Sequence, residues 1–145
     1  MTHLYEDLIT VLQREYDLCL ELIDLLKREK EVIVRLDAEE LETLLRDKEM
    51  ITFKIKGCDS KREKILEQMG FSNLKIKDVA QMVEGAQRLR LSELADNFTN
   101  VIQTIRDLNR INSRLIAKSL HYIKSSYNFL ATFNISPKEK FSVEA

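Results

Sequence analysis

The chain has 145 residues, of which 23 are basic and 24 acidic, and its formal net charge is -1. With 3 glycines, 1 proline, no tryptophan and 32% charged residues, this composition favours one domain of long helices with its own core. The opposite charges are interspersed, which excludes a nucleic-acid-binding surface and a polybasic membrane patch. Charge interrupts every apolar stretch before the roughly 18 residues of a membrane span, and the opening MTHLYEDL lacks a signal-peptide pattern. We therefore expect a cytoplasmic protein without stable membrane insertion.

A first long helix is predicted over residues 3–36, where apolar side chains recur at seven-residue spacing. Only Glu15 and Glu29 interrupt these apolar columns. Directly afterwards, Asp37 and Glu40 have the spacing of a capping box, in which the aspartate accepts from a free amide of the next helix and the glutamate reaches back. This pattern predicts a tight turn that folds the second helix back along the first.

The second helix is predicted over residues 38–69, with apolar columns that Lys48 and Arg62 interrupt. Gly70 is a suitable stop, because glycine adopts the left-handed conformation that ends many helices. A short connecting helix is expected from four apolar residues at helical spacing, which are Ile76, Val79, Ala80 and Val83. Residues 1–134 are thus predicted to form a single helical-bundle domain, and the charged, proline-containing residues 135–145 a disordered tail.

The third helix, predicted from about residue 87 to 133, carries the most regular apolar stripe of the chain. A further column widens this stripe into the face that a bundle needs, and its members are Ala95, Ile102, Asn109, Ile116, Ile123 and Leu130. Asn109 and Asn112 are both predicted to face inward, where asparagine costs stability but fixes the alignment of helices. The predicted fold class is all-α, an elongated antiparallel bundle of three long helices with a short connecting helix between the second and third.

The four charged residues that interrupt the first two helices have matched spacing. Glu15 with Arg62 and Glu29 with Lys48 have position numbers with the same sum, as residues at one level of an antiparallel hairpin do. The same register places Cys19 near Cys58. We interpret the two pairs as interhelical ion pairs that specify register rather than as a buried acid and base for catalysis. Both cysteines fall on apolar columns and are expected to be reduced core residues.

No motif in the sequence indicates catalysis, a cofactor or a metal. His3 and His121 are the only histidines, and neither lies in a helical metal-ligand pattern. Ser119 and Ser126 lie on a helical seam without the base and oxyanion hole that a nucleophile needs. We therefore expect a protein that is not an enzyme and binds no cofactor.

Aromatic and aliphatic residues gather in the last quarter of the chain, beyond the level at which the hairpin should end. If the third helix starts level with Gly70 and runs parallel to the first, its overhang begins near Tyr122. The candidate partner-binding residues are Tyr122, Ile123, Tyr127, Phe129, Leu130 and Phe133. They are either the end of the core or an exposed surface for a partner helix, which the predicted overhang favours.

The sequence resembles the FlgN family of flagellar export chaperones over most of its length, from Leu4 to Leu130. Two groups of residues carry the resemblance. The first is Glu29-Lys30, Asp37-x-x-Glu40, Lys48-Glu49, Arg62 and Met69-Gly70, and the second is the run LNRINSRLI over 108–116 followed by Ser119-Leu120. The resemblance implies a cytosolic, non-enzymatic chaperone for the C-terminal helical regions of the hook-filament junction proteins FlgK and FlgL. Such a chaperone would deliver these clients to the type III export gate.

In that family the end of the last helix is associated with substrate binding, and a nearby tyrosine with docking to the export gate. Here Tyr122 and Tyr127 are both candidates for the docking residue. A different class of protein fits the same pattern, namely a structural coiled-coil scaffold or adaptor that self-associates through the same apolar seam. The sequence leaves the oligomeric state open, because an exposed apolar overhang serves either a client or a second copy.

Overall fold

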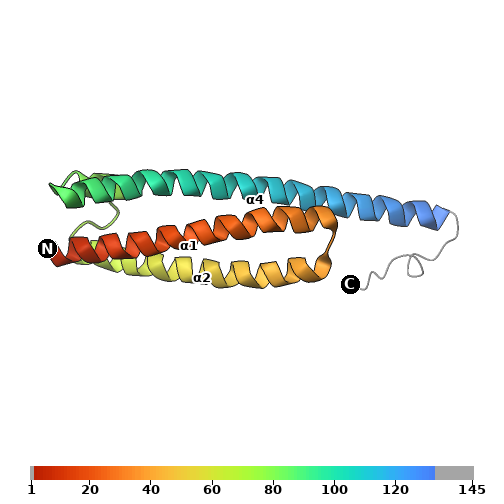
Figure 1. The fold of residues 1–145 in the computed structure, drawn as a ribbon, viewed down its shortest axis with the longest axis horizontal. Helices are drawn as coiled ribbons and strands as arrows, with labels where there is room; N and C mark the ends of the chain where they lie inside the picture. Colours follow the sequence, from red (N-terminus) through yellow and green to blue (C-terminus); the bar gives the residue numbers. More distant parts are fainter. Residues whose placement is uncertain (1, 133–145) are drawn as a thin grey trace.

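A computed structural model describes residues 2–132 of the chain. It contains the helices α1 (Thr2–Arg35), α2 (Ala38–Gln68), α3 (Ile76–Ala80) and α4 (Ala86–Thr132), and no strand occurs among the described residues. Figure 1 shows α1 and α2 as an antiparallel hairpin and α4 running alongside, parallel to α1. The predicted all-α fold of three long helices with a short connecting helix is therefore confirmed. The tail predicted over residues 135–145 lies outside the described residues.

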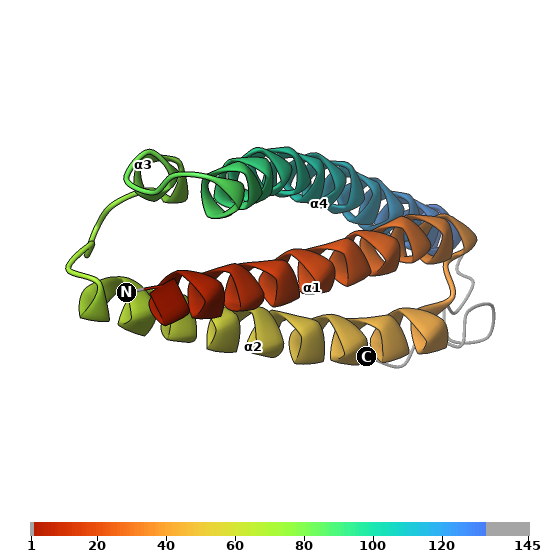
Figure 2. The same cartoon turned by 60° about the vertical axis from the view of Figure 1, so that its left-hand side comes forward.

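Helix α1 is the central element, because it packs against both other long helices. No Cα atom of α2 comes within 8 Å of a Cα atom of α4 in the described part of the chain. Four leucines of α1 are fully buried along its length, namely Leu8, Leu12, Leu18 and Leu26. The backbones of α2 and α4 are therefore separated (Figure 2), and the side of the bundle between them, which contains a groove, is here called the open side.

The turn between α1 and α2 follows from its sequence. Asp37 caps α2, with its Oδ1 accepting from the backbone N–H of Glu40 at 3.0 Å, as predicted. The Glu40 carboxylate does not complete the capping box, because it accepts instead from Arg35 at 2.9 Å. The amide of Asp37 bonds to the carbonyl of Val32 at 3.3 Å. This closure requires Leu36 to adopt the left-handed conformation, with φ of 57°.

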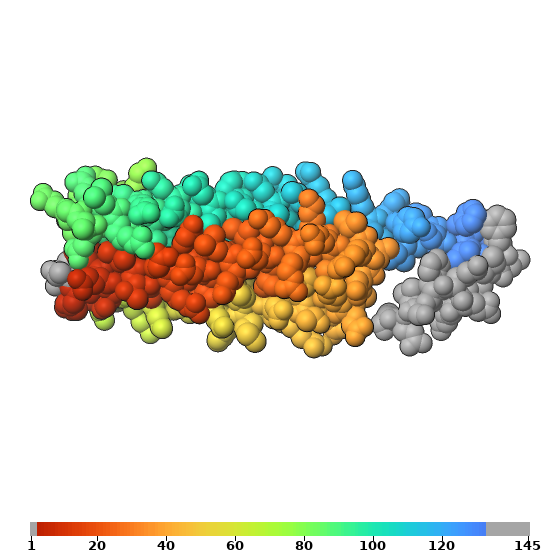
Figure 3. All heavy atoms as spheres, in the orientation of Figure 1, coloured from red at the N-terminus to blue at the C-terminus, as the bar shows by residue number. Residues whose placement is uncertain are grey.

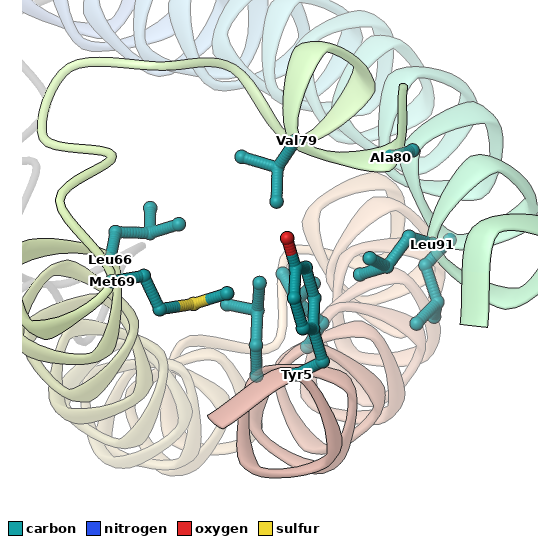
Figure 4. Packing of buried hydrophobic residues seen from close by; sticks show 9 residues of the cluster. Tyr5, Leu66, Met69, Val79, Ala80 and Leu91 are labelled. Atoms are coloured by element: carbon teal, nitrogen blue, oxygen red, sulfur yellow. The ribbon is translucent and has the colours of Figure 1, made fainter. Parts of the chain in front are cut away.

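The connection from α2 to α4 closes one end of the open side. Gly70, with φ of 77°, ends α2 in the left-handed conformation, as predicted. The short helix α3 then places Val79 and Ala80 in a fully buried position. Figure 4 shows Val79 pointing toward Tyr5, with Leu66 and Met69 contributed by α2 and Leu91 by α4. At this end, all four helices share one apolar cluster.

Two further apolar clusters continue the core toward the hairpin turn. The middle cluster contains Cys19, Ile23 and Val101 and therefore joins α1 to α4. The last cluster contains Leu25, Val32 and Leu44 and joins α1 to α2. Since a fully buried aliphatic side chain contributes roughly 1.5–3 kcal/mol, the middle cluster helps to hold α4 on α1 and the last cluster helps to hold the hairpin together.

Candidate partner-binding site

The alignment of α4 on α1 is fixed by two contacts. The rings of Tyr16 and Phe98 meet edge to face with centroids 6.1 Å apart. About two and a half turns before the end of α1, the side-chain nitrogen of Asn112 donates to the carbonyl of Leu26 at 2.9 Å. With this offset, α4 passes the end of α1 at about residue 119. The remaining part of α4 projects beyond the hairpin by about 20 Å, at 1.5 Å per residue, as Figures 1 and 3 show.

The projecting segment, residues 119–132 and here called the overhang, exposes most of the predicted partner-binding side chains. Tyr122 is 64% exposed, Tyr127 47% and Ile123 39%, so these residues are not the end of the core. Phe129 is also exposed, Leu130 is half-buried, and Phe133 lies outside the described residues. Leu120 is exposed as well, and the periodicity missed it because it lies off the predicted apolar columns. The apolar face needed for binding a helix is thus accessible, and binding itself stays a prediction.

The prediction that Asn109 faces inward is wrong. Asn109 is exposed, whereas Asn112 is 2% exposed. The reason lies in the open side of the bundle, where α2 does not reach the further column of α4 that includes Asn109. Ile102 and Ile116 of this column are about two-fifths exposed for the same reason. The widened face predicted from the sequence exists, but no helix of the described chain covers it.

Asn112 belongs to a buried polar node that connects all three long helices. Its side-chain nitrogen donates to Oε1 of Glu29 at 2.8 Å, and the ammonium of Lys48 donates to Oε2 of the same carboxylate at 2.8 Å. Glu29 is buried, so each of its oxygens exchanges water for a protein donor. The Oδ1 atom of Asn112 is buried without a hydrogen-bond partner among the described residues. The contact between Glu29 and Lys48 is confirmed, and its role in specifying register stays a prediction.

The second predicted pair, Glu15 with Arg62, is also present. A guanidinium nitrogen of Arg62 donates to the two carboxylate oxygens of Glu15 at 2.8 and 3.0 Å. A second nitrogen lies 2.9 Å from the carboxylate of Asp59, which the sequence reasoning missed although it lies one turn before Arg62. Burial is the main cause that raises the pKa of Glu15 to about 8, and the neighbouring Asp59 adds to it against the opposing effect of Arg62.

The two cysteines are free and buried, as the sequence predicts. Burial raises the pKa of the Cys19 thiol to about 11, with smaller contributions from the charges of Glu15, Asp59 and Cys58. Burial also raises the pKa of Cys58. Since the thiolate is the reactive form, both side chains behave as small core residues.

A groove of about 740 Å³ lies on the open side, between α2, the connection and the start of α4. Leu12, Leu66 and Ile102 line it together with charged residues that include Arg62, Glu67 and Lys75. No group of three or more His, Cys, Asp or Glu side chains among residues 2–132 could hold a metal ion. None of the described helices is both long and apolar enough to cross a membrane.

These features define a class of protein, an elongated helical bundle whose longest helix presents uncovered apolar positions. The model of the family described as FlgN protein matches residues 1–133. The chain therefore belongs to the FlgN family, as the sequence motifs indicate, and the family implies the role of a flagellar export chaperone. Searches of curated proteins and of solved structures each found no match.

Proposed function

We propose that this chaperone binds the C-terminal helical regions of the hook-filament junction proteins FlgK and FlgL on the overhang of α4. The observation that carries the proposal is the exposure of Leu120, Tyr122, Ile123 and Tyr127 on α4, beside which no other helix of residues 2–132 lies at this level. An amphipathic client helix loses apolar surface to water when it packs on such a face, which drives association. A client whose apolar stripe is covered in this way is unable to assemble before export.

We further propose that the complex forms in the cytoplasm and is delivered to the type III export gate. Tyr122 and Tyr127 are the candidates for gate docking, because aromatic side chains with a polar tip contribute strongly to protein interfaces. Tyr122 is the more exposed of the two.

The test measures binding of purified FlgK and FlgL C-terminal segments by isothermal titration calorimetry. Replacing Leu120, Ile123 and Leu130 by glutamine should weaken binding at least 30-fold, or about 2 kcal/mol, as for clustered hot spots. A matched control replaces three apolar residues in the exposed part of α2, namely Leu45, Met50 and Phe53, and should leave the affinity within threefold.

Unchanged affinity in the overhang variant, with a verified client, would exclude this surface. A separate outcome favours the alternative class of protein. If neither client segment binds and light scattering finds a tight homodimer that the overhang substitutions dissociate, the protein is a self-associating scaffold. Gate docking is tested by Tyr122→Ala and Tyr127→Ala, of which one should weaken binding to the export gate by a larger factor than it weakens binding to the client.

A further inference from the structure

The charges of the chain are not interspersed in the second half of α4. Between Leu108 and Thr132 the sequence has no aspartate or glutamate, whereas it has the four cations Arg110, Arg114, Lys118 and Lys124. Helices α1 and α2 carry both signs throughout. The even mixture of opposite charges that the whole chain predicts is therefore absent from this segment, which includes the overhang.

Two cations flank the apolar face of the overhang, one directly before the overhang and one within it. Lys118 lies one turn before Tyr122, while Lys124 lies one turn after Leu120 and one turn before Tyr127. At about 100° per residue, Lys118 and Lys124 fall on opposite edges of the arc that Tyr122, Ile123 and Tyr127 occupy. Both lysines are exposed. Any helix lying on the apolar arc would therefore have a cation along each side.

Three of the four cations have no acidic partner within the described chain. Arg110 lies 3.6 Å from Asp107, and none of the ion pairs among residues 2–132 involves Arg114, Lys118 or Lys124. The other cations around the hairpin turn behave differently, since Arg35 pairs with Glu40 and Lys48 with Glu29. The overhang and the residue directly before it thus carry positive charge that no ion pair among residues 2–132 neutralises.

We infer that the partner of the overhang is an amphipathic helix whose apolar stripe is flanked by aspartate or glutamate. This inference rests on the proposed function and adds the charge of the client to it. Rim charges contribute mainly to the rate of encounter and to the rejection of like-charged partners. The cations on the two edges therefore select acidic-flanked helices among the many amphipathic helices that the apolar arc could cover.

An anionic membrane is the other surface that a basic amphipathic helix fits. The placement of the hairpin turn favours a helix over a membrane. The first turn of α2 carries Glu39 and Glu40, and the hairpin turn ends at the level where α4 continues alone (Figure 1). A flat anionic surface that contacts α4 would also approach these carboxylates, whereas a single helix follows α4 alone.

The test uses the full chain and three labelled amphipathic peptides that share one apolar stripe and differ only in their flanking positions. These positions are all glutamate, all glutamine or all lysine. By fluorescence anisotropy at low salt, the glutamate peptide should bind at least tenfold more tightly than the glutamine peptide, and the lysine peptide should bind most weakly. Because exposed charges are screened by salt, the preference should fall below threefold at high salt.

Paired variants connect the preference to the overhang. Lys118→Gln with Lys124→Gln should reduce the preference for the glutamate peptide to below threefold, whereas Lys61→Gln with Lys64→Gln, at exposed and unpaired positions of α2, should keep it. Equal binding of all three peptides, lost only in the Leu120, Ile123 and Leu130 variant, would overturn this inference and leave the proposed function intact. Binding to phosphatidylserine vesicles without binding to any peptide would overturn both.

Discussion

Removal of the Glu29 carboxylate is the most informative perturbation of the fold, because this group joins all three long helices. In Glu29→Ala, Lys48 loses its acceptor and one N–H of Asn112 is left without a partner inside the protein. The second N–H of that amide keeps its bond to the carbonyl of Leu26. The variant therefore leaves a buried amide hydrogen and a partly buried ammonium unpaired.

The expected loss of stability follows from burial. Breaking a buried ion pair by removing one partner costs roughly 3–5 kcal/mol. The side chain of Lys48 is 23% exposed and can reach water, which places the loss near the lower limit. We expect Glu29→Ala to lower the free energy of unfolding by about 3 kcal/mol. Lys48→Ala should cost less, because Asn112 still donates to Glu29.

Urea unfolding followed by circular dichroism measures these differences. The control is Glu42→Ala, which breaks the exposed pair with Arg46 at 2.9 Å and should cost about 0.5 kcal/mol or less. A double-mutant cycle of Glu29 and Lys48 should give a coupling of at least ~1 kcal/mol. If Glu29→Ala costs no more than Glu42→Ala, the node does not hold the helices together.

Three further predictions concern Glu15, the two asparagines of α4 and Leu36. Because the folded pKa of Glu15, about 8, exceeds its ordinary value of 4.5, its contribution to stability is present below pH 4.5 and is lost as pH rises through 8. Glu15→Gln should remove this loss of stability with rising pH and be the more stable protein at alkaline pH. If urea unfolding gives the same dependence of stability on pH for both proteins, the raised pKa of Glu15 is contradicted. Asn109→Leu should change the free energy of unfolding by less than ~0.5 kcal/mol. Asn112→Leu should lower it by ~1–2 kcal/mol, because buried Glu29 loses a donor. Equal effects of the two variants in thermal unfolding would contradict the difference in burial. Leu36→Gly should stabilise the hairpin by ~0.5–1 kcal/mol, since the leucine is half exposed and its φ of 57° favours glycine. A lower melting temperature of the variant would show that the contacts of Leu36 stabilise the hairpin by more than its left-handed backbone destabilises it.

Local periodicity was sufficient to predict the hairpin and its ion pairs. Charged residues that interrupt apolar columns at equal spacing must meet in an antiparallel register, which is why Glu15 and Glu29 found their predicted partners. Gly70 and Asp37 ended and began helices as their conformational preferences require. The projection of α4 beyond the hairpin was predictable from helix lengths alone.

The position of Asn109 was not predictable in this way. Whether a third column is buried depends on whether α2 and α4 approach each other, and that distance is set by side-chain packing across three helices. The periodicity of α4 contains no information about it. The sequence also did not predict that Glu29 bonds to both Lys48 and Asn112. The bond to Asn112 depends on how α4 is rotated relative to α1, which periodicity does not give.

The separation of α2 from α4 has a consequence for the order in which the molecule comes apart. Apart from the contacts of α4 with α3, each of these helices has its backbone neighbours within 8 Å on α1, so either can leave while most backbone contacts of the other remain. The hairpin joins segments close in sequence, whereas Asn112 closes a loop of more than eighty residues back to α1. We expect α4 to detach first and α1 to open last. Native-state amide exchange should therefore be slowest in α1, because both α2 and α4 pack against this helix.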